Sequence, residues 1–145
     1  MKIYLAAALR FKERVAEFAR QIPSPHVVTS RWLYEHPCPE DPCPEDPDEK
    51  EKFLRETALM DLADIREADV IVRFSDIEVI SQYVKLVPRD LATGARHFEV
   101  GYALAQGKPV IVVGGCQNVF DHLPNILHLK DGEALLQYLN MGPKR

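Results

Sequence analysis

Glu99 is the single acidic residue of a largely apolar segment with helical character that runs from 95 to 106. Its position in the first turns places it near free backbone N–H groups and the positive end of the helix dipole, which stabilise an anion. An ionised, partly shielded carboxylate is what a nucleophile requires. The alternative is an acid that only complements the dipole, and from this segment alone that alternative is favoured, because such acids are common.

A second acid, Asp61, changes that balance. The segment from 51 to 68 has helical periodicity, and Asp61 falls inside its apolar stripe. The other members of the stripe are Leu54, Ala58 and Ile65. A carboxylate on a core-facing line needs a partner or a function, because desolvating it costs several kcal/mol. Two acids that each need an explanation make acid–base or nucleophilic chemistry the stronger hypothesis.

Asp61 has a structural alternative as well. It is then a buried acid that caps a neighbouring backbone or pairs with Arg10 or Arg96. Asp64, one turn further along the same segment, lies toward the edge of the stripe, and we expect solvent to reach it.

The helix that carries Glu99 has clear boundaries. Gly94 supplies the turn before it and Gly107 stops it. Its apolar face holds Phe98, Gly101, Tyr102 and Ala105, and Val100 and Leu104 continue this face around the helix. We therefore expect this helix to be packed on nearly all sides.

Strands and helices alternate along the whole chain. The predicted strands are 2–7, 26–31, 69–74, 108–113 and 126–129, and the predicted helices are 10–21, 50–67, 95–106 and 131–140. This order predicts an α/β fold: a single doubly wound, flavodoxin- or Rossmann-like parallel sheet of about five strands with helices on both faces. We expect residues 1–145 to form one domain, because a hydrophobic content of 46% over 145 residues supports one core.

Two segments fall outside this alternation. The stretch 36–49 is rich in proline and acid, so we expect a surface loop. The stretch 75–92 contains EVISQYVKLV, whose alternation suits a hairpin or lid, with an ordinary surface insertion as the equal alternative.

In doubly wound sheets, ligands bind beyond the carboxyl ends of the strands, where the strand order reverses. Tyr4 on the first strand, the loop residues 6–10, Asp61 and Glu99 are all placed to converge there. The formal net charge is −4 and no basic stripe with interleaved aromatics occurs, so nucleic acid is not expected as a partner. An anionic small molecule needs only a local pocket.

The N-terminal apolar stretch is short and is followed by charged residues instead of a cleavage site, so we read it as a strand and expect a cytoplasmic protein without a membrane span. The three cysteines are an odd number, which favours a reducing compartment over a disulfide scaffold. Cys38 and Cys43 lie in a tandem PCPED repeat whose spacing does not favour zinc, and no metal site is predicted. For Cys116 an incidental or structural thiol is the favoured interpretation.

Three blocks of the chain, KIYLAA, MDLADIREADVIV and EVGYALAQGKPVIVVG, resemble the nucleoside 2-deoxyribosyltransferase family, including its relatives that hydrolyse nucleoside 5′-monophosphates. The resemblance implies that Glu99 is the nucleophile, that Asp61 contacts or helps to protonate the nucleobase, and that Tyr4 orients the nucleophile. It also implies a homodimer or larger assembly, in which Asn118 and Phe120 reach into a neighbouring subunit's pocket. No cofactor is implied.

The chain also departs from that family. Thr93 stands where some members have a sugar-binding aspartate, and the loop AAALR lacks the serines and glycines that hold a 5′-phosphate in the nucleotide-hydrolysing relatives. Arg10 and Arg96 are available to an anion instead. The substrate-binding positions that we predict are Ala7, Arg10, Asp64, Thr93, Gly94, Arg96, Asn118 and Phe120.

The predicted activity is cleavage or transfer at the N-glycosidic bond of a nucleoside or nucleotide. Such a reaction develops oxocarbenium character at C1′, which a carboxylate stabilises or captures, while a proton or hydrogen bond eases the departure of the base. Two alternatives stay open: a nucleoside 5′-monophosphate N-glycosidase and a nucleotide sensor without turnover. A third alternative is a flavodoxin-like binding module. The last is disfavoured, because the first loop lacks a phosphate cradle.

Overall fold

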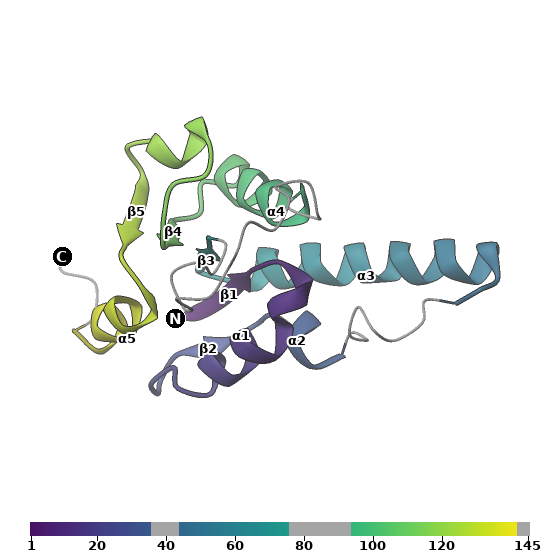
Figure 1. The fold of residues 1–145 in the computed structure, drawn as a ribbon, viewed down its shortest axis with the longest axis horizontal. Helices are drawn as coiled ribbons and strands as arrows, with labels where there is room; N and C mark the ends of the chain where they lie inside the picture. The colour runs from purple at the N-terminus through teal and green to yellow at the C-terminus, as the bar shows by residue number, and fades with distance from the viewer. Residues whose placement is uncertain (36–43, 76–93, 142–145) are drawn as a thin grey trace, which may run out of the picture.

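The computed structural model describes residues 1–35, 44–75 and 94–141. Five parallel strands form one sheet in the order β2-β1-β3-β4-β5 (Figure 1). The strands are β1 (Lys2–Ala6), β2 (Val27–Val28), β3 (Val70–Phe74), β4 (Val110–Val113) and β5 (Ile126–Leu129). The order reverses beside β1, and β1 and β3 are the central strands at this switch point.

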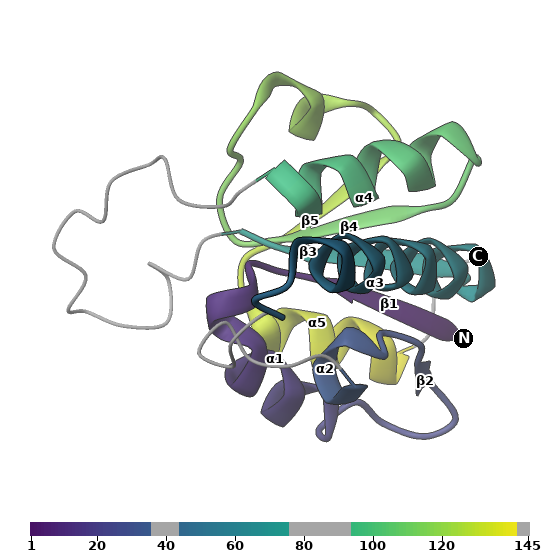
Figure 2. The same cartoon turned by 90° about the vertical axis from the view of Figure 1, so that its right-hand side faces the viewer.

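Helices cover both faces of the sheet. They are α1 (Lys12–Ala19), α2 (Trp32–Glu35), α3 (Pro47–Glu67), α4 (Gly94–Ala105) and α5 (Gly132–Met141), with short 3-10 helices η1 (Leu9–Phe11) and η3 (Val119–His122). Figure 2 shows α4 on one side of the sheet and α1 and α5 on the other. α3 and α4 contact each other, and both contact β1. The predicted doubly wound α/β fold is confirmed.

The central strands are apolar on both faces because helices cover both faces. All five residues of β3 and all four of β4 are buried, as expected for a parallel sheet enclosed in this way. One charged residue, Arg73, lies in this run with no exposed surface. Gly107 ends α4 with a φ of +70°, which only glycine adopts readily, so the predicted stop of this helix is confirmed.

The second strand is shorter than predicted. The sequence predicts a strand over 26–31, but β2 spans only Val27–Val28. The chain leaves the sheet because side chains take over its hydrogen bonding to β1: Ser30 Oγ accepts from Leu5 N, and Trp32 Nε1 donates to Leu5 O at 2.8 Å. The short helix α2 follows directly.

The proline-rich loop ends earlier than predicted. Residues 36–43 lie outside the described part of the chain, but Pro47 is already the first helical residue of α3. Asp46 caps this helix by accepting from the backbone N–H groups of Asp48 and Glu49, each at 3.0 Å. Proline is well suited to the first helical position, where its missing N–H costs nothing, so the predicted boundary at 49 was wrong.

The predicted core-facing stripe of this helix is only half right. Ile65 is fully buried, but Leu54 is 50% exposed and Ala58 is exposed as well. Figure 1 shows the reason: the first part of α3 extends beyond the sheet, so among the described elements no strand lies under its apolar residues.

The apolar face predicted for α4 also lies differently. Phe98 is 64% exposed, and Gly101 and Ala105 are exposed too. The side of α4 that faces the sheet carries Val100, which was predicted as a continuation of that face, and Ala103, which was not. The expectation that α4 is packed on nearly all sides is therefore wrong in the described structure.

The hypothesis of a lid over 75–92 falls on residues 76–93, which lie outside the described part of the chain. Among the described residues, none of the helices combines the length and apolar character required to cross a bilayer.

Candidate active site

Tyr4 and Glu99 meet on the face of the sheet covered by α3 and α4. Tyr4 lies in the middle of β1 with no exposed surface, and its hydroxyl donates a hydrogen bond of 2.9 Å to Oε1 of Glu99. Glu99 lies in the second turn of α4 and is half-buried. A strand tyrosine and a helix glutamate, far apart in sequence, are thus brought together as predicted.

Burial dominates the titration of Glu99. Desolvation raises the pKa of Glu99 from 4.5 to about 7; the Tyr4 hydrogen bond and the charge of Arg96 act downward, while the charge of Asp61 acts upward. The sequence led us to expect an ionised carboxylate stabilised by the helix start. Instead, the pKa of Glu99 lies well above that of an ordinary glutamate, because the loss of water outweighs the favourable groups.

Asp61 shares the environment of this pair. It is half-buried on α3, and burial followed by the charge of Asp64 raises its pKa from 3.8 to about 6, against a smaller downward effect of Arg31. Its own charge raises the pKa values of Tyr4 and Glu99. Both carboxyl groups therefore have raised pKa values, and the charge of Asp61 contributes to the shift of Glu99. The predicted convergence of these three residues is therefore supported by their electrostatics.

Asp64 is not solvated, contrary to the prediction. It is 2% exposed, and Arg31 engages both of its carboxylate oxygens: the side-chain Nε donates to Oδ1 at 2.7 Å and the backbone N to Oδ2 at 2.8 Å. The segment that follows β2 covers this part of α3, which periodicity within α3 alone does not reveal. In the described structure Asp64 therefore links α3 to the segment after β2 through its contacts with Arg31. It also adds negative charge beside Asp61.

The remaining predicted binding residues are spread around this centre. Arg96 is buried in the first turn of α4, which begins at Gly94, and its charge acts on Glu99. Ala7 follows β1 and is half-buried. Arg10 is exposed, with its guanidinium 4.8 Å from the ring centroid of Phe11. Thr93 lies outside the described residues.

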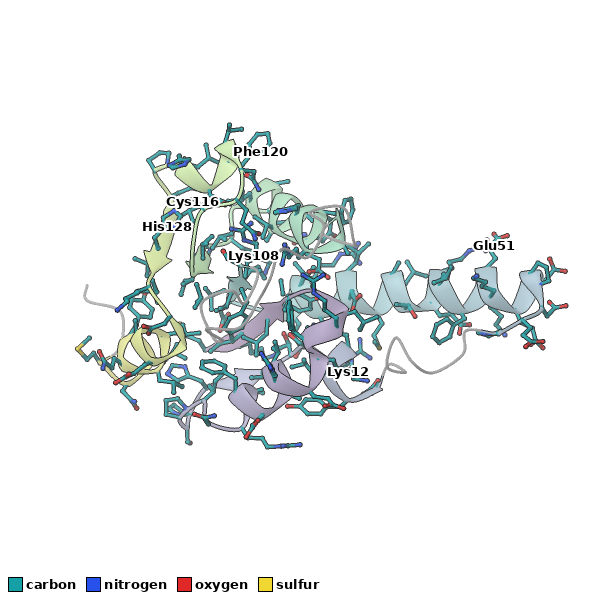
Figure 3. All side chains as sticks on the ribbon, in the orientation of Figure 1. Lys12, Glu51, Lys108, Cys116, Phe120 and His128 are labelled. Carbon is teal, nitrogen blue, oxygen red and sulfur yellow. The ribbon has the colours of Figure 1, made fainter. Side chains whose placement is uncertain are left out.

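Asn118 and Phe120 lie on the segment between β4 and β5. Asn118 caps η3 by accepting from the backbone N of Phe120 at 2.9 Å, and its Nδ2 lies 3.1 Å from Nδ1 of His97. Phe120 is 65% exposed and points outward from η3 (Figure 3). Within one chain, therefore, Asn118 contacts His97 of α4, whereas Phe120 is open to solvent.

Sequence reasoning missed the buried pair that holds this segment. Arg73 of β3 donates from Nη2 to Oδ2 of Asp121 at 2.7 Å, and its Nη1 lies 3.3 Å from Nδ1 of His97. The same carboxylate oxygen accepts from the backbone N of Gln117 at 2.6 Å. The available signal was the lone arginine in the apolar run VIVRF, because a charge in a central strand requires a buried partner.

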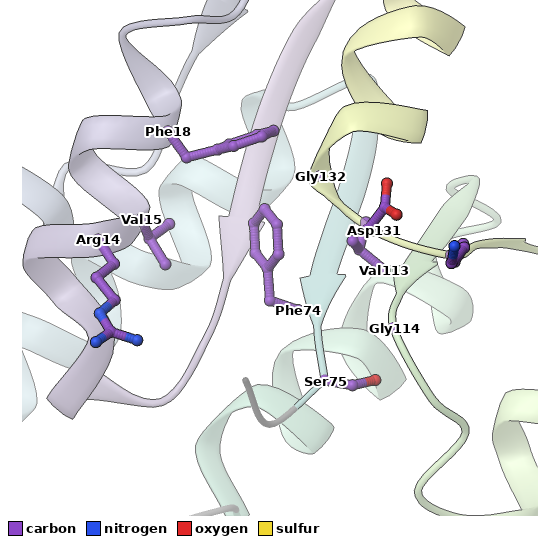
Figure 4. A pocket seen from close by; sticks show the side chains of 10 residues that line it. Arg14, Val15, Phe18, Phe74, Ser75, Val113, Gly114, Asp131 and Gly132 are labelled. Atoms are coloured by element: carbon purple, nitrogen blue, oxygen red, sulfur yellow. The ribbon is translucent and has the colours of Figure 1, made fainter. Parts of the chain in front are cut away.

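A separate apolar cavity lies on the opposite face of the sheet. Val15 and Phe18 of α1, Phe74 of β3 and Val113 of β4 line it, and Arg14 lies at its edge (Figure 4). It contains neither Glu99 nor Asp61. Its lining also includes the polar residues Arg14, Ser75, Lys130 and Asp131. We place the chemistry at Glu99 and Asp61, because these two carboxyl groups have raised pKa values and lie beside the Tyr4 hydroxyl. Within the described ranges, no three side chains of the metal-binding types gather in one place.

The fold and the paired acids define a class: a doubly wound α/β protein with two carboxyl groups and a tyrosine on the α3/α4 face. No protein-family model and no curated protein matches the chain. Among solved structures, it is similar to the CMP N-glycosidase BcmB of Clostridium botulinum, with 17% identity and a TM-score of 0.53 over 98% of this chain and 100% of that one.

It is also similar to a 2-deoxyribosyltransferase of the psychrotolerant bacterium Bacillus psychrosaccharolyticus, with 18% identity and a TM-score of 0.59 over 95% of this chain and 92% of that one. At these identities the likeness establishes a shared fold. The two names agree with the resemblance found in the sequence.

Proposed function

We propose that this protein is an enzyme that cleaves the N-glycosidic bond of a nucleoside or nucleotide, with Glu99 as the nucleophile. The observation that carries the proposal is the 2.9 Å hydrogen bond from buried Tyr4 to Glu99, with Asp61 close enough to raise the pKa of both. The two solved structures that share the fold over nearly its whole length are named for a glycosidase and a deoxyribosyltransferase, which supports the same chemistry.

Each acid has a distinct role in this mechanism. Ionised Glu99 attacks C1′ of the sugar as the bond to the base weakens, and it captures the developing oxocarbenium ion as a glycosyl ester. Tyr4 holds the attacking carboxylate in position through its hydroxyl. Asp61, whose pKa is about 6, supplies a proton or a hydrogen bond to the departing base.

The fate of the ester decides between hydrolysis and transfer. Water releases the free sugar, whereas a second base that enters first produces a new nucleoside. Transfer therefore requires a site that excludes water until the acceptor is bound. We propose transfer of a deoxyribosyl group as the main reaction, with hydrolysis of a nucleoside 5′-monophosphate as the second candidate.

The positive groups around the site could bind a phosphate of the substrate. Buried Arg96 stands in the first turn of α4, where backbone N–H groups also point outward from the helix start at Gly94. Arg10 and Ala7 follow the carboxyl end of β1. We propose that these residues, together with Thr93, contact the sugar and any 5′-phosphate.

A chromatographic assay tests the activity. The purified protein is incubated with deoxynucleosides and with dCMP, with and without an added acceptor base, and the release of free base is followed. We expect free base in the absence of acceptor and a new nucleoside in its presence, and neither product from Glu99→Ala. Binding of the same compounds without any turnover would identify a nucleotide sensor and overturn the enzymatic proposal.

We further propose that the protein functions as a homodimer or larger assembly. The exposed side of α4 carries Phe98, whose ring stacks on Tyr102 at a centroid distance of 6.3 Å, and η3 adds Phe120. Exposed aromatics of this kind are typical of protein interfaces. A second copy seated here would cover them and receive Asn118 and Phe120.

Sedimentation velocity tests the assembly. Phe98→Asp is expected to shift the protein toward the monomer and to lower its activity. The matched control is Met141→Asp, because Met141 is 70% exposed on α5, away from α4. A monomeric wild type would contradict the proposed assembly without affecting the roles of Glu99 and Asp61.

A further inference from the structure

A thiol and an imidazole face each other at the far edge of the sheet. Cys116 follows β4, and His128 lies on β5, the last strand of the sheet. Sγ of Cys116 lies 3.7 Å from Nδ1 of His128, and both residues are exposed. Figure 3 shows them side by side below η3. Nothing in the sequence connects them, because eleven residues that include the helix η3 separate them, and Cys116 alone suggested an incidental thiol.

The proton on His128 can be placed from its second contact. Its Nε2 lies 2.5 Å from the backbone oxygen of Asp121. A carbonyl oxygen only accepts hydrogen bonds, so Nε2 carries the hydrogen. In the neutral ring Nδ1 is then the bare nitrogen, and it is the atom that faces the thiol. Cys116 is therefore positioned to donate its S–H proton to His128.

The carbonyl that orients His128 is itself fixed. Asp121 is 1% exposed, and its carboxylate accepts hydrogen bonds from Arg73 and from the backbone of Gln117. Thiol, base and orienting group thus form a chain whose last member is anchored in the sheet. A nucleophile, a base and a third group that orients the base is the arrangement by which proteins activate a thiol.

We propose that Cys116 and His128 form a thiol–imidazole pair, and that Cys116 is the site at which this protein undergoes exchange with low-molecular-weight disulfides. The S–H proton passes to Nδ1 of His128, and Sγ attacks one sulfur of the disulfide RSSR. The Sγ–S bond forms as the S–S bond of RSSR breaks. The departing RS⁻ takes the proton from the imidazolium, so the products are Cys116–S–S–R and RSH.

The choice of a small disulfide follows from the surroundings of the thiol. The apolar cavity between α1 and α5 does not include Cys116, and the thiol is exposed. Exchange requires only an accessible, deprotonated sulfur. The reaction is independent of the proposed glycosidic activity, since neither Glu99 nor Asp61 takes part in it.

The experiment uses the full chain with Cys38→Ser and Cys43→Ser, so that Cys116 is the remaining cysteine. The probe is 2-hydroxyethyl disulfide, which is uncharged, and intact mass reports the adduct over time at about pH 7. His128→Gln is the matched variant, because its amide nitrogen can still donate to the Asp121 carbonyl while the base opposite the thiol is lost. We expect it to react about tenfold more slowly. Cys116→Ser in the same background forms no adduct.

Two results would overturn the proposal. One is a folded His128→Gln variant, shown by circular dichroism and an unchanged thermal transition, that reacts within twofold of its parent. The other needs no variant at position 128: the parent reacting no faster than N-acetylcysteine under the same conditions. The second comparison decides the question even if His128→Gln does not fold.

Discussion

The hydroxyl of Tyr4 donates a 2.9 Å hydrogen bond to Glu99, and this contact joins the central strand β1 to α4. Tyr4 has no exposed surface, and burial, followed by the charge of Glu99, raises its pKa well above the usual value. The hydroxyl therefore keeps its proton throughout the working range and acts only as a donor. It stabilises Glu99 most when Glu99 is ionised, which is the form that attacks.

Tyr4→Phe is expected to slow the reaction while the fold is kept, because the ring remains in the core. The lost hydrogen bond lowers the pKa of Glu99 in the wild type, so its removal raises that pKa further. The ascending limb of kcat/KM against pH then moves to higher pH. The loss of a hydrogen bond to a charged group corresponds to about a tenfold lower kcat/KM near neutral pH.

The matched control for this variant is Tyr102→Phe. This variant removes the hydroxyl of Tyr102 on α4, which accepts from Arg66 Nε at 2.7 Å. It leaves Glu99 untouched. A profile for Tyr4→Phe that coincides with that of Tyr102→Phe would contradict the role given to Tyr4.

The paired acids predict a bell-shaped pH profile. The reaction needs Glu99 ionised and Asp61 protonated. Because the pKa of Glu99 is about 7 and that of Asp61 is about 6, most of the singly protonated protein carries its proton on Glu99, and the reactive form is a minor population that is largest between these two values. We expect kcat/KM of the wild type to be highest in that interval and to fall on both sides. Steady-state kinetics across the range measure the two limbs.

Asp61→Asn separates the two limbs. Without the neighbouring negative charge, the pKa of Glu99 falls, so the ascending limb moves to lower pH and the descending limb is lost. We expect kcat to drop by about a hundredfold, with a smaller change in KM. Glu67→Gln on the same helix is the control, because Glu67 forms its salt bridge with Lys2 at the surface. Unchanged limbs in Asp61→Asn would remove Asp61 from the reaction.

The sequence predicted the sheet well and the surroundings of the acids less well. Apolar runs such as VIVV specify buried strands by themselves, and the wider β/α alternation fixes how they connect. The burial of Asp64 depends instead on Arg31, which comes from a different element. Periodicity within α3 contains no information about that partner.

The exposed face of α4 shows a second limit. Phe98 and Tyr102 have the spacing of a core face, and spacing alone does not distinguish a face that packs on the sheet from one that is open to a partner. The protonation of Glu99 was also out of reach, because it depends on how much water the assembled fold removes. The pairing of Tyr4 with Glu99 was predicted from the family resemblance, not from local pattern.

Glu99→Gln is expected to abolish activity and to stabilise the protein at high pH. The pKa of Glu99 is raised on folding from 4.5 to about 7, so the folded state holds more protons than the unfolded state between these values. Stability of the wild type therefore falls as pH rises through this window and stays lower above it. Glutamine carries no charge to desolvate and still accepts from Tyr4.

Urea unfolding at two pH values measures this effect. At about pH 8 we expect Glu99→Gln to be more stable than the wild type by about 2 kcal/mol, a figure reduced from the full shift because Glu99 is only half-buried. At about pH 4 both side chains are neutral and the two proteins should be equally stable. Equal stability at the higher pH would show that the carboxylate is not desolvated as the structure indicates.

The buried pair of Arg73 and Asp121 predicts a non-additive response. Arg73→Met leaves the Asp121 carboxylate without its cation in an enclosed site, which costs about 3 kcal/mol or more. Adding Asp121→Asn removes the stranded charge, while the amide oxygen still accepts from the backbone of Gln117. We therefore expect the double variant to be more stable than Arg73→Met alone.

A double-mutant cycle by urea unfolding measures this coupling. The control cycle uses Lys2 and Glu67, whose salt bridge of 2.6 Å is exposed on both sides, and it should give less than about 1 kcal/mol. If Arg73→Met lowers the free energy of unfolding no more than Lys2→Met does, the charge on Asp121 is not confined to the interior. A large coupling would show that this ion pair helps to hold the segment carrying Asn118 to the sheet, because Asp121 accepts from Arg73 of β3 and from the backbone of that segment at the same carboxylate oxygen.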